Sequence, residues 1–195
     1  AIGCDLLACS PYKFYGPHLG TMFVRQDLLE RLDVPKVEPA ANNAPDRLET
    51  GTQSHEAIAG AAAAVEFLAS LSPAETSRRA ALHSTMTGLH ERGLQQVTRL
   101  WHALRALPGV SVYGPPPTRP RTSTISFVLA GKSSTDVARH CATRGLFVSN
   151  GDFYALTVAR RLGQEADGFV RLGCAAYTTD DEVERVIAVI AELAR

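Results

Sequence analysis

Short apolar runs and helical stripes of apolar residues follow one another along the chain, and this pattern predicts a mixed α/β protein. The run at 3–9 reads as a buried strand that ends at the Ser10–Pro11 turn. Residues 20–25 read as a second strand, because β-branched and aromatic residues lie between polar ends. A short helix is expected at 26–31, and the proline- and asparagine-rich segment 33–47 is expected to be a loop.

Two longer helices are predicted in the middle of the chain. Ser54 is a suitable N-cap for a helix that ends near Leu71. Ser72, followed by Pro73 and Glu75, reads as the start of the next helix, which is expected to reach about Leu107. Its apolar residues recur at helical spacing: Leu82, Met86, Leu89, Leu94, Val97, Leu100, Trp101 and Leu104.

After the Pro108–Gly109 break, strands and helices alternate at short intervals. Strands are expected at 110–113, 123–129, 146–149 and 169–172. Helices are expected at 133–144, 154–162 and 179–194. Alternation of this kind predicts a small α/β domain whose sheet is covered by helices.

The amino-acid composition and charge of the chain indicate which kinds of binding partner it favours. The chain has 195 residues, of which 45% are hydrophobic, and its 20 basic and 20 acidic residues cancel. This balance argues against nucleic acid or an anionic membrane as the main partner, because both favour an electropositive surface. No apolar run is as long as the roughly 18 residues that a membrane span needs. The chain opens directly on an apolar run without an initiator Met, so we expect it to be a piece of a longer protein.

The cysteines and histidines predict no metal centre. Four cysteines, at positions 4, 9, 141 and 174, match no zinc or redox spacing, and we interpret them as reduced thiols of a cytoplasmic protein. His83 and His90 lie seven residues apart on the long predicted helix. Two histidines without a third ligand are better explained as solvated side chains than as metal ligands.

The sharpest chemical signal is Lys13. It lies between Tyr12 and Phe14–Tyr15, after a predicted strand and before Gly16–Pro17. A solvated lysine in a surface turn is the simpler interpretation. However, apolar and aromatic surroundings disfavour an ammonium, and a neutral lysine amine forms Schiff bases with carbonyl groups. Ser10, three residues earlier, supplies a hydroxyl that can bind a phosphate.

The run from Ser10 to Pro17 resembles the cofactor-lysine segment of class V aminotransferases and cysteine desulfurases, a family of fold-type I enzymes that depend on pyridoxal 5'-phosphate (PLP). Three further segments resemble that family in the same order: residues 47–53 (RLETGTQ), 149–151 (SNG) and the ending 170–183, with Arg171 and Tyr177. The resemblance covers nearly the whole chain. It implies an α/β fold of type I: the end of the PLP-binding large domain at 1–53, bridging helices at 54–107, and the C-terminal small α/β domain at 108–195.

The resemblance also implies roles for single residues. Lys13 would hold PLP as a Schiff base and then move protons at the substrate α-carbon, while Ser10 and the Tyr12 hydroxyl would bind the phosphate. Gly51 and Thr52 would reach the PLP of a neighbouring subunit, so a homodimer with shared active sites is implied; taken alone, this pair also suits an ordinary helix-entry turn.

Substrate contacts are implied for the C-terminal part of the chain. Arg171 would bind the carboxylate of an amino-acid substrate, because its fork of donors matches a planar anion; pairing with a surface acid is the alternative. Asn150, in the small-domain loop, and His18, beside the lysine segment, are the other candidate substrate contacts. A plain turn residue explains His18 equally well.

One departure bears on the reaction. Cysteine desulfurases of this group carry a nucleophilic cysteine in the small-domain loop, in a pattern like Arg-x-Gly-His-His-Cys-Ala, and Tyr154 stands at that position here. Cys174, three residues after Arg171, would point to the opposite face of a regular strand. The sequence therefore favours a desulfurase-like lyase without the usual cysteine, an aminotransferase, or an epimerase similar to isopenicillin N epimerase. A non-catalytic scaffold protein with this fold is the rival from another class.

Overall fold

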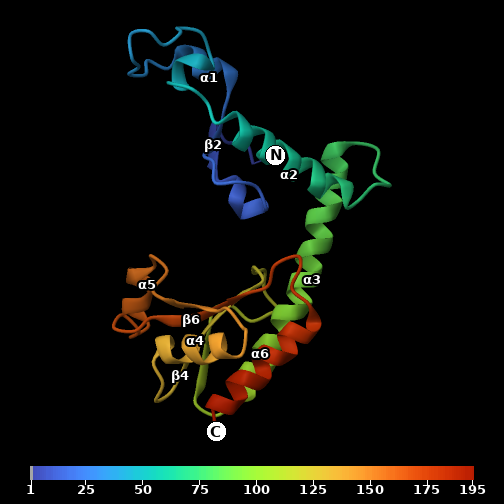
Figure 1. Cartoon of the computed structure of the whole chain (residues 1–195), viewed down its shortest axis with the longest axis vertical. Coiled ribbons are helices and arrows are strands. Elements are labelled where there is room, and N and C mark those ends of the chain that lie inside the picture. The colour runs from blue at the N-terminus through green and yellow to red at the C-terminus, as the bar shows by residue number, and fades with distance from the viewer. Residues whose placement is uncertain (1) are drawn as a thin grey trace. The chain divides into compact units, whose positions relative to one another are not determined.

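The computed structural model describes residues 2–195, which form two compact units, one ending at Thr85 and one from Met86 to Arg195 (Figure 1). The first unit begins with an antiparallel hairpin of β1 (Leu6–Cys9) and β2 (Thr21–Val24), in which Cys9 lies opposite Thr21. A 3-10 helix, η1 (Pro11–Phe14), connects the two strands. The unit continues through α1 (Gln26–Arg31), a second 3-10 turn, η2 (Asp46–Leu48), and α2 (His55–Ser70).

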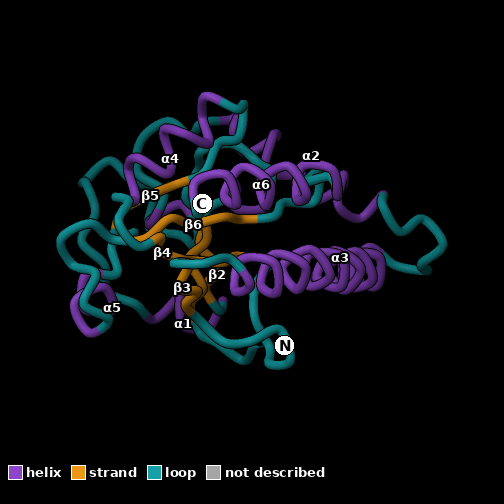
Figure 2. Tube along the Cα trace, turned by 90° about the horizontal axis from the view of Figure 1, so that it is seen from below, coloured by secondary structure: helices purple, strands orange, loops and turns teal. Residues whose placement is uncertain are grey.

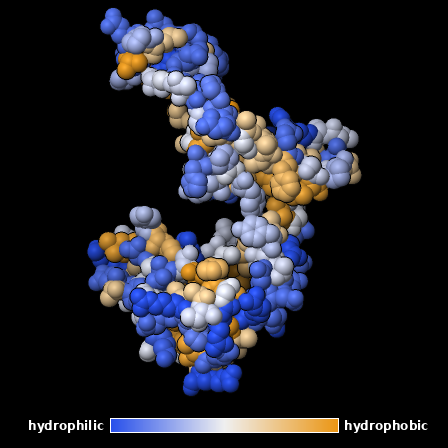
Figure 3. All heavy atoms as spheres, in the orientation of Figure 1, coloured by the Kyte–Doolittle hydropathy of each residue, from blue (hydrophilic) through white to orange (hydrophobic). Residues whose placement is uncertain are grey.

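The prediction of a buried first strand is wrong for this chain. Leu6 and Leu7 are 48% and 44% exposed, and Met22 and Phe23 on the partner strand are 51% and 54% exposed. The reason is that β1 pairs with a single strand, in a sheet of two. Hydrophobic surface is also exposed along α2 (Figure 3), where Phe67 is 58% exposed.

The long helix starts later than the sequence predicts. Helix α3 spans Arg78–Ala106, and its first turn is capped by Ser77, whose hydroxyl accepts a hydrogen bond from Ala80 N at 3.2 Å. Ser72, the predicted cap, is used differently: its hydroxyl lies 2.9 Å from Thr85 Oγ1. Thr85 in turn donates to the carbonyl of Leu68 at 2.9 Å, so this buried chain of hydroxyls joins the end of α2 to α3 instead of capping a helix.

The second unit is built on a four-stranded antiparallel sheet of order β3–β4–β6–β5 (Figure 2). Its strands are β3 (Val110–Tyr113), β4 (Thr124–Leu129), β5 (Ser149–Gly151) and β6 (Phe169–Gly173). Its helices are α4 (Ser134–Thr143), α5 (Leu156–Arg161) and α6 (Asp180–Leu193).

Strand β5 lies three residues later than the predicted 146–149. Leu146 is used to close the end of α4, where its N–H bonds to the carbonyl of Cys141 at 3.0 Å and its side chain is buried. This later start fixes how β5 pairs with β6: Ser149 lies opposite Arg171, and Gly151 lies opposite Phe169.

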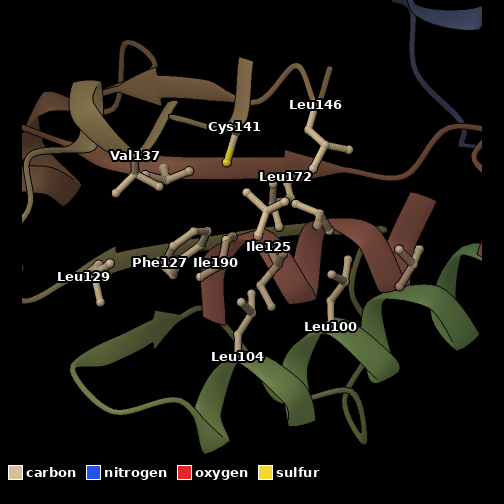
Figure 4. Close-up of a cluster of buried hydrophobic side chains, with 14 of the residues drawn as sticks. Leu100, Leu104, Ile125, Phe127, Leu129, Val137, Cys141, Leu146, Leu172 and Ile190 are labelled. Carbon is tan, nitrogen blue, oxygen red and sulfur yellow. The ribbon is translucent and has the colours of Figure 1, made fainter. Parts of the chain in front are cut away.

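One face of this sheet carries the core. Residues of β4 alternate between buried and half-buried, so that Ile125, Phe127 and Leu129 all point to the same side. They meet Leu100 and Leu104 of α3, together with residues of α4 and α6 (Figure 4): Val137, Cys141, Val186 and Ile190. On β6, Val170 and Leu172 are 0% and 6% exposed, and the alternation of side chains places Arg171 on the opposite face.

The start of α6 and the state of the cysteines agree with the sequence predictions. Helix α6 begins with a capping box between Thr179 and Glu182, and the hydrogen bond from the Thr179 N–H lowers the pKa of the Glu182 carboxyl. All four cysteines are free thiols, as predicted. In the part of the chain that the structure describes, no helix combines the length and apolarity that crossing a membrane requires.

Candidate functional site

The lysine turn is held by close backbone packing. Pro11 occupies the first position of η1 and is buried, and its carbonyl accepts a hydrogen bond from Gly16 N at 2.9 Å. A Cβ at position 16 would lie 2.9 Å from Pro11 Cβ, which is closer than real contacts allow. Glycine is therefore required at position 16 for the chain to turn back from η1 into β2.

Ser10 and Lys13 line one hollow of about 550 Å³ between β1, η1 and β2. The Ser10 hydroxyl is half-buried and makes no cap bond to η1, so the helix start does not use it. Lys13 is exposed, and its Nζ lies 5.4 Å from the centre of the Tyr12 ring. The apolar enclosure expected around Lys13 is thus absent from residues 2–195, because the aromatic neighbours cover only part of the side chain.

The lining of this hollow fits a phosphate-bearing aldehyde such as PLP. It offers a primary amine and a hydroxyl, and its other residues are neutral: Ala8, Cys9, Phe14, Gly20, Thr21 and Met22. No carboxylate of the described chain lines it, so nothing in the wall repels a phosphate. Its volume is within the range typical of small-molecule sites.

Tyr12 and His18 pack on each other instead of lining this hollow. Their rings are stacked with centres 4.8 Å apart and planes inclined by 17°. Both side chains are exposed. The structure therefore brings these two predicted residues together beside Lys13, with neither among the lining residues of the hollow within residues 2–195.

Gly51 and Thr52 lie in an exposed segment just before α2. Gly51 has φ +80°, a conformation that favours glycine, and both residues are exposed. The segment is anchored by Arg47, which donates to the carbonyls of Leu29 and Leu32. Neither Gly51 nor Thr52 lines the Lys13 hollow within the described residues.

Arg171 lies on the sheet face opposite the core of the second unit. Its cross-strand neighbours are Ser126 on β4 and Ser149 on β5, two small residues that leave its side chain exposed. The guanidinium carbon lies 3.9 Å from the centre of the Phe153 ring. None of the ion pairs within residues 2–195 includes Arg171, so the alternative of a surface salt bridge is not observed in the described chain.

Asn150 is not brought to Arg171. It pairs with Val170 in the sheet, so its side chain points to the other face, where Nδ2 donates to Thr135 Oγ1 at 3.0 Å. This bond ties β5 to the start of α4. The residue of β5 that lies opposite Arg171 is Ser149 instead.

The loop position of the desulfurase cysteine is occupied by an exposed phenol. Tyr154 is fully exposed at 105% and has φ +60°. Cys174 packs against the core, as the strand alternation predicted, and burial raises the pKa of its thiol. A neutral, half-buried thiol is a poor nucleophile.

Sequence reasoning missed three residues near these sites: Cys9, Ser149 and Phe153. Cys9 lines the Lys13 hollow, with its Sγ 2.8 Å from Thr21 Oγ1. Its position directly before Ser10 could have indicated this. The position of Ser149 beside Arg171 depends on the register of β5. The position of Phe153 depends on the left-handed backbone of Phe153 and Tyr154, which a single sequence does not reveal.

Comparison with solved structures defines the class of fold. Residues covering 97% of the chain superpose on a cysteine desulfurase from Thermococcus onnurineus NA1 with a TM-score of 0.80 and 24% identity, and cover 47% of that structure. A cysteine desulfurase from Escherichia coli gives a TM-score of 0.75 at 22% identity, over 97% of this chain and 46% of the other. The architecture is therefore that of fold type I, as the sequence motifs implied.

Sequence relationships specify the family. Residues 1–186 match the aminotransferase class-V family, and the chain belongs to it. A cysteine desulfurase of Klebsiella pneumoniae is 28% identical over 201 residues, which span 96% of this chain and 45% of that protein. A probable cysteine desulfurase of Pseudomonas aeruginosa is 30% identical over 94% of this chain and 44% of its own length. The chain thus spans less than half the length of these relatives.

Proposed function

We propose that the whole protein is a PLP-dependent enzyme that acts on an amino acid, with Lys13 as the residue that bonds to the cofactor. The observation that carries this proposal is the hollow that Ser10 and Lys13 both line, in the segment whose sequence resembles the family's cofactor-lysine segment. When bound, PLP supplies an electron sink that stabilises negative charge at the substrate α-carbon.

The residues of the hollow then have separate tasks. The Ser10 hydroxyl donates to the phosphate, because no cap bond to η1 occupies it. The Lys13 amine fixes the aldehyde end and afterwards takes up and returns a proton at the α-carbon. Tyr12 and His18 are stacked on each other beside Lys13, so we propose that the phenol binds the phosphate and that the imidazole contacts the substrate from this side.

Dimerisation is part of the proposal. Gly51 and Thr52 are exposed and outside the Lys13 hollow of their own chain, which suits residues that serve a second subunit. The Gly51 N–H and the Thr52 hydroxyl are both phosphate donors. We therefore propose a homodimer in which these residues complete the partner's phosphate site.

Arg171 is the proposed carboxylate receptor. Its guanidinium is exposed and has no acidic partner within residues 2–195, so its donors remain available for a substrate anion. A planar guanidinium binds a carboxylate through two parallel hydrogen bonds.

Replacing Arg171 by Ala in the full-length holoenzyme should weaken amino-acid binding by about ten- to a hundredfold, because a charged hydrogen-bonded contact is lost. PLP content should stay the same. Titration of the cofactor's absorbance with amino acid measures this, and Arg139→Ala, on the exposed surface of α4, is the matched control. Unchanged affinity in Arg171→Ala would assign that residue a structural role only.

Within the class, the loop favours a reaction without a protein persulfide. A persulfide requires a thiolate that reaches the substrate sulfur, and Tyr154 carries a phenol at the matching position. The reactions that remain are those of a desulfurase-like lyase, a class V aminotransferase or an epimerase similar to isopenicillin N epimerase.

Supplied with cysteine and a thiol reductant, which provides the two electrons that release of sulfide alongside alanine requires, the full-length enzyme should form alanine and sulfide slowly or not at all. Without the reductant, no persulfide should form on the protein. Cys174→Ser should leave that rate unchanged, because this thiol does not replace the loop cysteine. Formation of alanine and sulfide, together with mass analysis of the protein, measures both points. Fast turnover that Cys174→Ser abolishes would overturn this view of the reaction.

A further inference from the structure

Arg171 contacts the ring of Phe153, a residue that lies outside the segments that resemble the family. Of the four basic side chains that lie over aromatic rings in the described chain, Arg171 makes the closest contact, at 3.9 Å from the Phe153 ring centre. The other three lie between 5.2 and 5.7 Å from their rings. At 3.9 Å the guanidinium carbon is in van der Waals contact with the face of the ring, where the aromatic quadrupole attracts a cation.

A strained loop presents the Phe153 ring. Phe153 and Tyr154 have φ values of +56° and +60°, a left-handed conformation that residues other than glycine rarely adopt. Asp152 holds them in it: its Oδ1 accepts from Tyr154 N at 2.9 Å, and its carbonyl accepts from Ala155 N at 2.9 Å. Strain that the surrounding bonds maintain at two consecutive residues is a feature of functional loops.

Close backbone contact fixes the base of this loop beside β6. A Cβ at Gly168 would lie 2.2 Å from the carbonyl carbon of Gly151, so glycine is required there. Gly151 itself has φ +118°. The loop that starts at Gly151 is thereby locked next to the start of β6, two residues before Arg171.

The ring contact leaves the guanidinium ready for one kind of ligand. The Phe153 ring covers one side of the guanidinium carbon, while the N–H donors lie in the plane of the guanidinium and point outward from its edge. The Arg171 side chain is exposed, and its cross-strand neighbours Ser126 and Ser149 are small. The arrangement suits a planar carboxylate bound edge to edge.

We propose that Phe153 is a positioning residue, which holds the Arg171 guanidinium in the orientation that binds the α-carboxylate of the amino-acid substrate. This inference rests on the proposed function for the identity of the ligand, and on the ring contact for the role of Phe153. Phe153 does not touch the reacting atoms; it acts through Arg171. The Asp152 bonds and the left-handed pair maintain the position of the ring.

The test compares Phe153→Leu with Phe153→Tyr in the full-length holoenzyme. Leucine keeps an apolar side chain and, like phenylalanine, must adopt the left-handed conformation at position 153, but it has no aromatic face. Tyrosine retains the ring. Phe153→Leu should weaken binding of the amino acid by about two- to thirtyfold, the range expected for a cation–π contact. Binding of the corresponding amine without a carboxylate, the PLP content and the circular dichroism should not change, and Phe153→Tyr should behave like the wild type.

A second measurement is independent of amino-acid binding. Phenylglyoxal modifies exposed guanidinium groups, and peptide mapping gives its rate at Arg171. The rate should be several times faster in Phe153→Leu than in the wild type or Phe153→Tyr, because the ring shields the cation. Equal rates in all three proteins, or equal losses of amino-acid and amine binding in Phe153→Leu, would overturn the positioning role. If phenylglyoxal modifies Arg171 faster in Phe153→Leu than in the wild type, but the wild type binds no amino acid, the proposed function and the carboxylate ligand are overturned. The Phe153–Arg171 contact would then still stand.

Discussion

Replacing Lys13 by Ala should reduce turnover of the full-length enzyme by about 10²- to 10⁴-fold from the lost proton transfer alone. The substituted side chain has no amine to bond to PLP or to move a proton at the α-carbon. Ser10 remains, so part of the cofactor affinity should persist. Steady-state turnover and the absorbance of bound PLP measure the two effects separately.

Two further variants make this prediction specific. Lys13→Arg keeps a positive charge at the position but provides no amine for a Schiff base, so it should be as inactive as Lys13→Ala. Lys132→Ala removes an exposed lysine from the turn before α4 and should leave turnover unchanged. Substantial activity in Lys13→Arg would show that charge alone is needed at position 13.

Replacing Phe127 by Ala should lower the free energy of unfolding of the C-terminal unit by about 3–5 kcal/mol. Phe127 is completely buried at the centre of β4, where its ring packs between strands and the helices of the core. Truncation removes apolar contacts and leaves a cavity that rigid neighbours fill only in part.

Trp101 makes this measurement direct. It is the single tryptophan of the chain and is 5% exposed in the same core, so its fluorescence during denaturant unfolding reports on this unit. Val128→Ala is the matched control, because Val128 is the next residue of β4 and points to the other face; its cost should be about 1 kcal/mol or less. Equal losses in the two variants would contradict the assignment of the core to one face of the sheet.

The order of elements was predictable because it depends on local patterns. The period of apolar residues predicted the order of the α-helices and strands, and β4 alternates as the sequence indicates, whereas the two short 3-10 helices were not predicted. Errors arose where two local signals competed. Ser72–Pro73 is a good helix start, yet the buried hydrogen bond to Thr85 uses Ser72, and Ser77 caps the helix instead.

The candidate site was predictable only where a motif carried it. Lys13 and Ser10 were singled out from their local chemistry, the family resemblance gave their roles and the role of Arg171, and the first two line a common hollow. The position of Asn150 could not be predicted, because a shift of a strand by one residue moves a side chain to the other face. Phe153 was missed because its contact depends on two left-handed residues, and such conformations in residues other than glycine are set by the surrounding structure.

The central claim is that Lys13 holds the cofactor, and borohydride reduction of the full-length holoenzyme tests it most directly. Reduction makes the bond between a lysine amine and PLP permanent, so peptide mapping identifies the lysine. Our account predicts a pyridoxyl group on the peptide that contains Lys13. A label on Lys36 or Lys132, the other two lysines of the chain, or on a lysine outside these 195 residues, would contradict it.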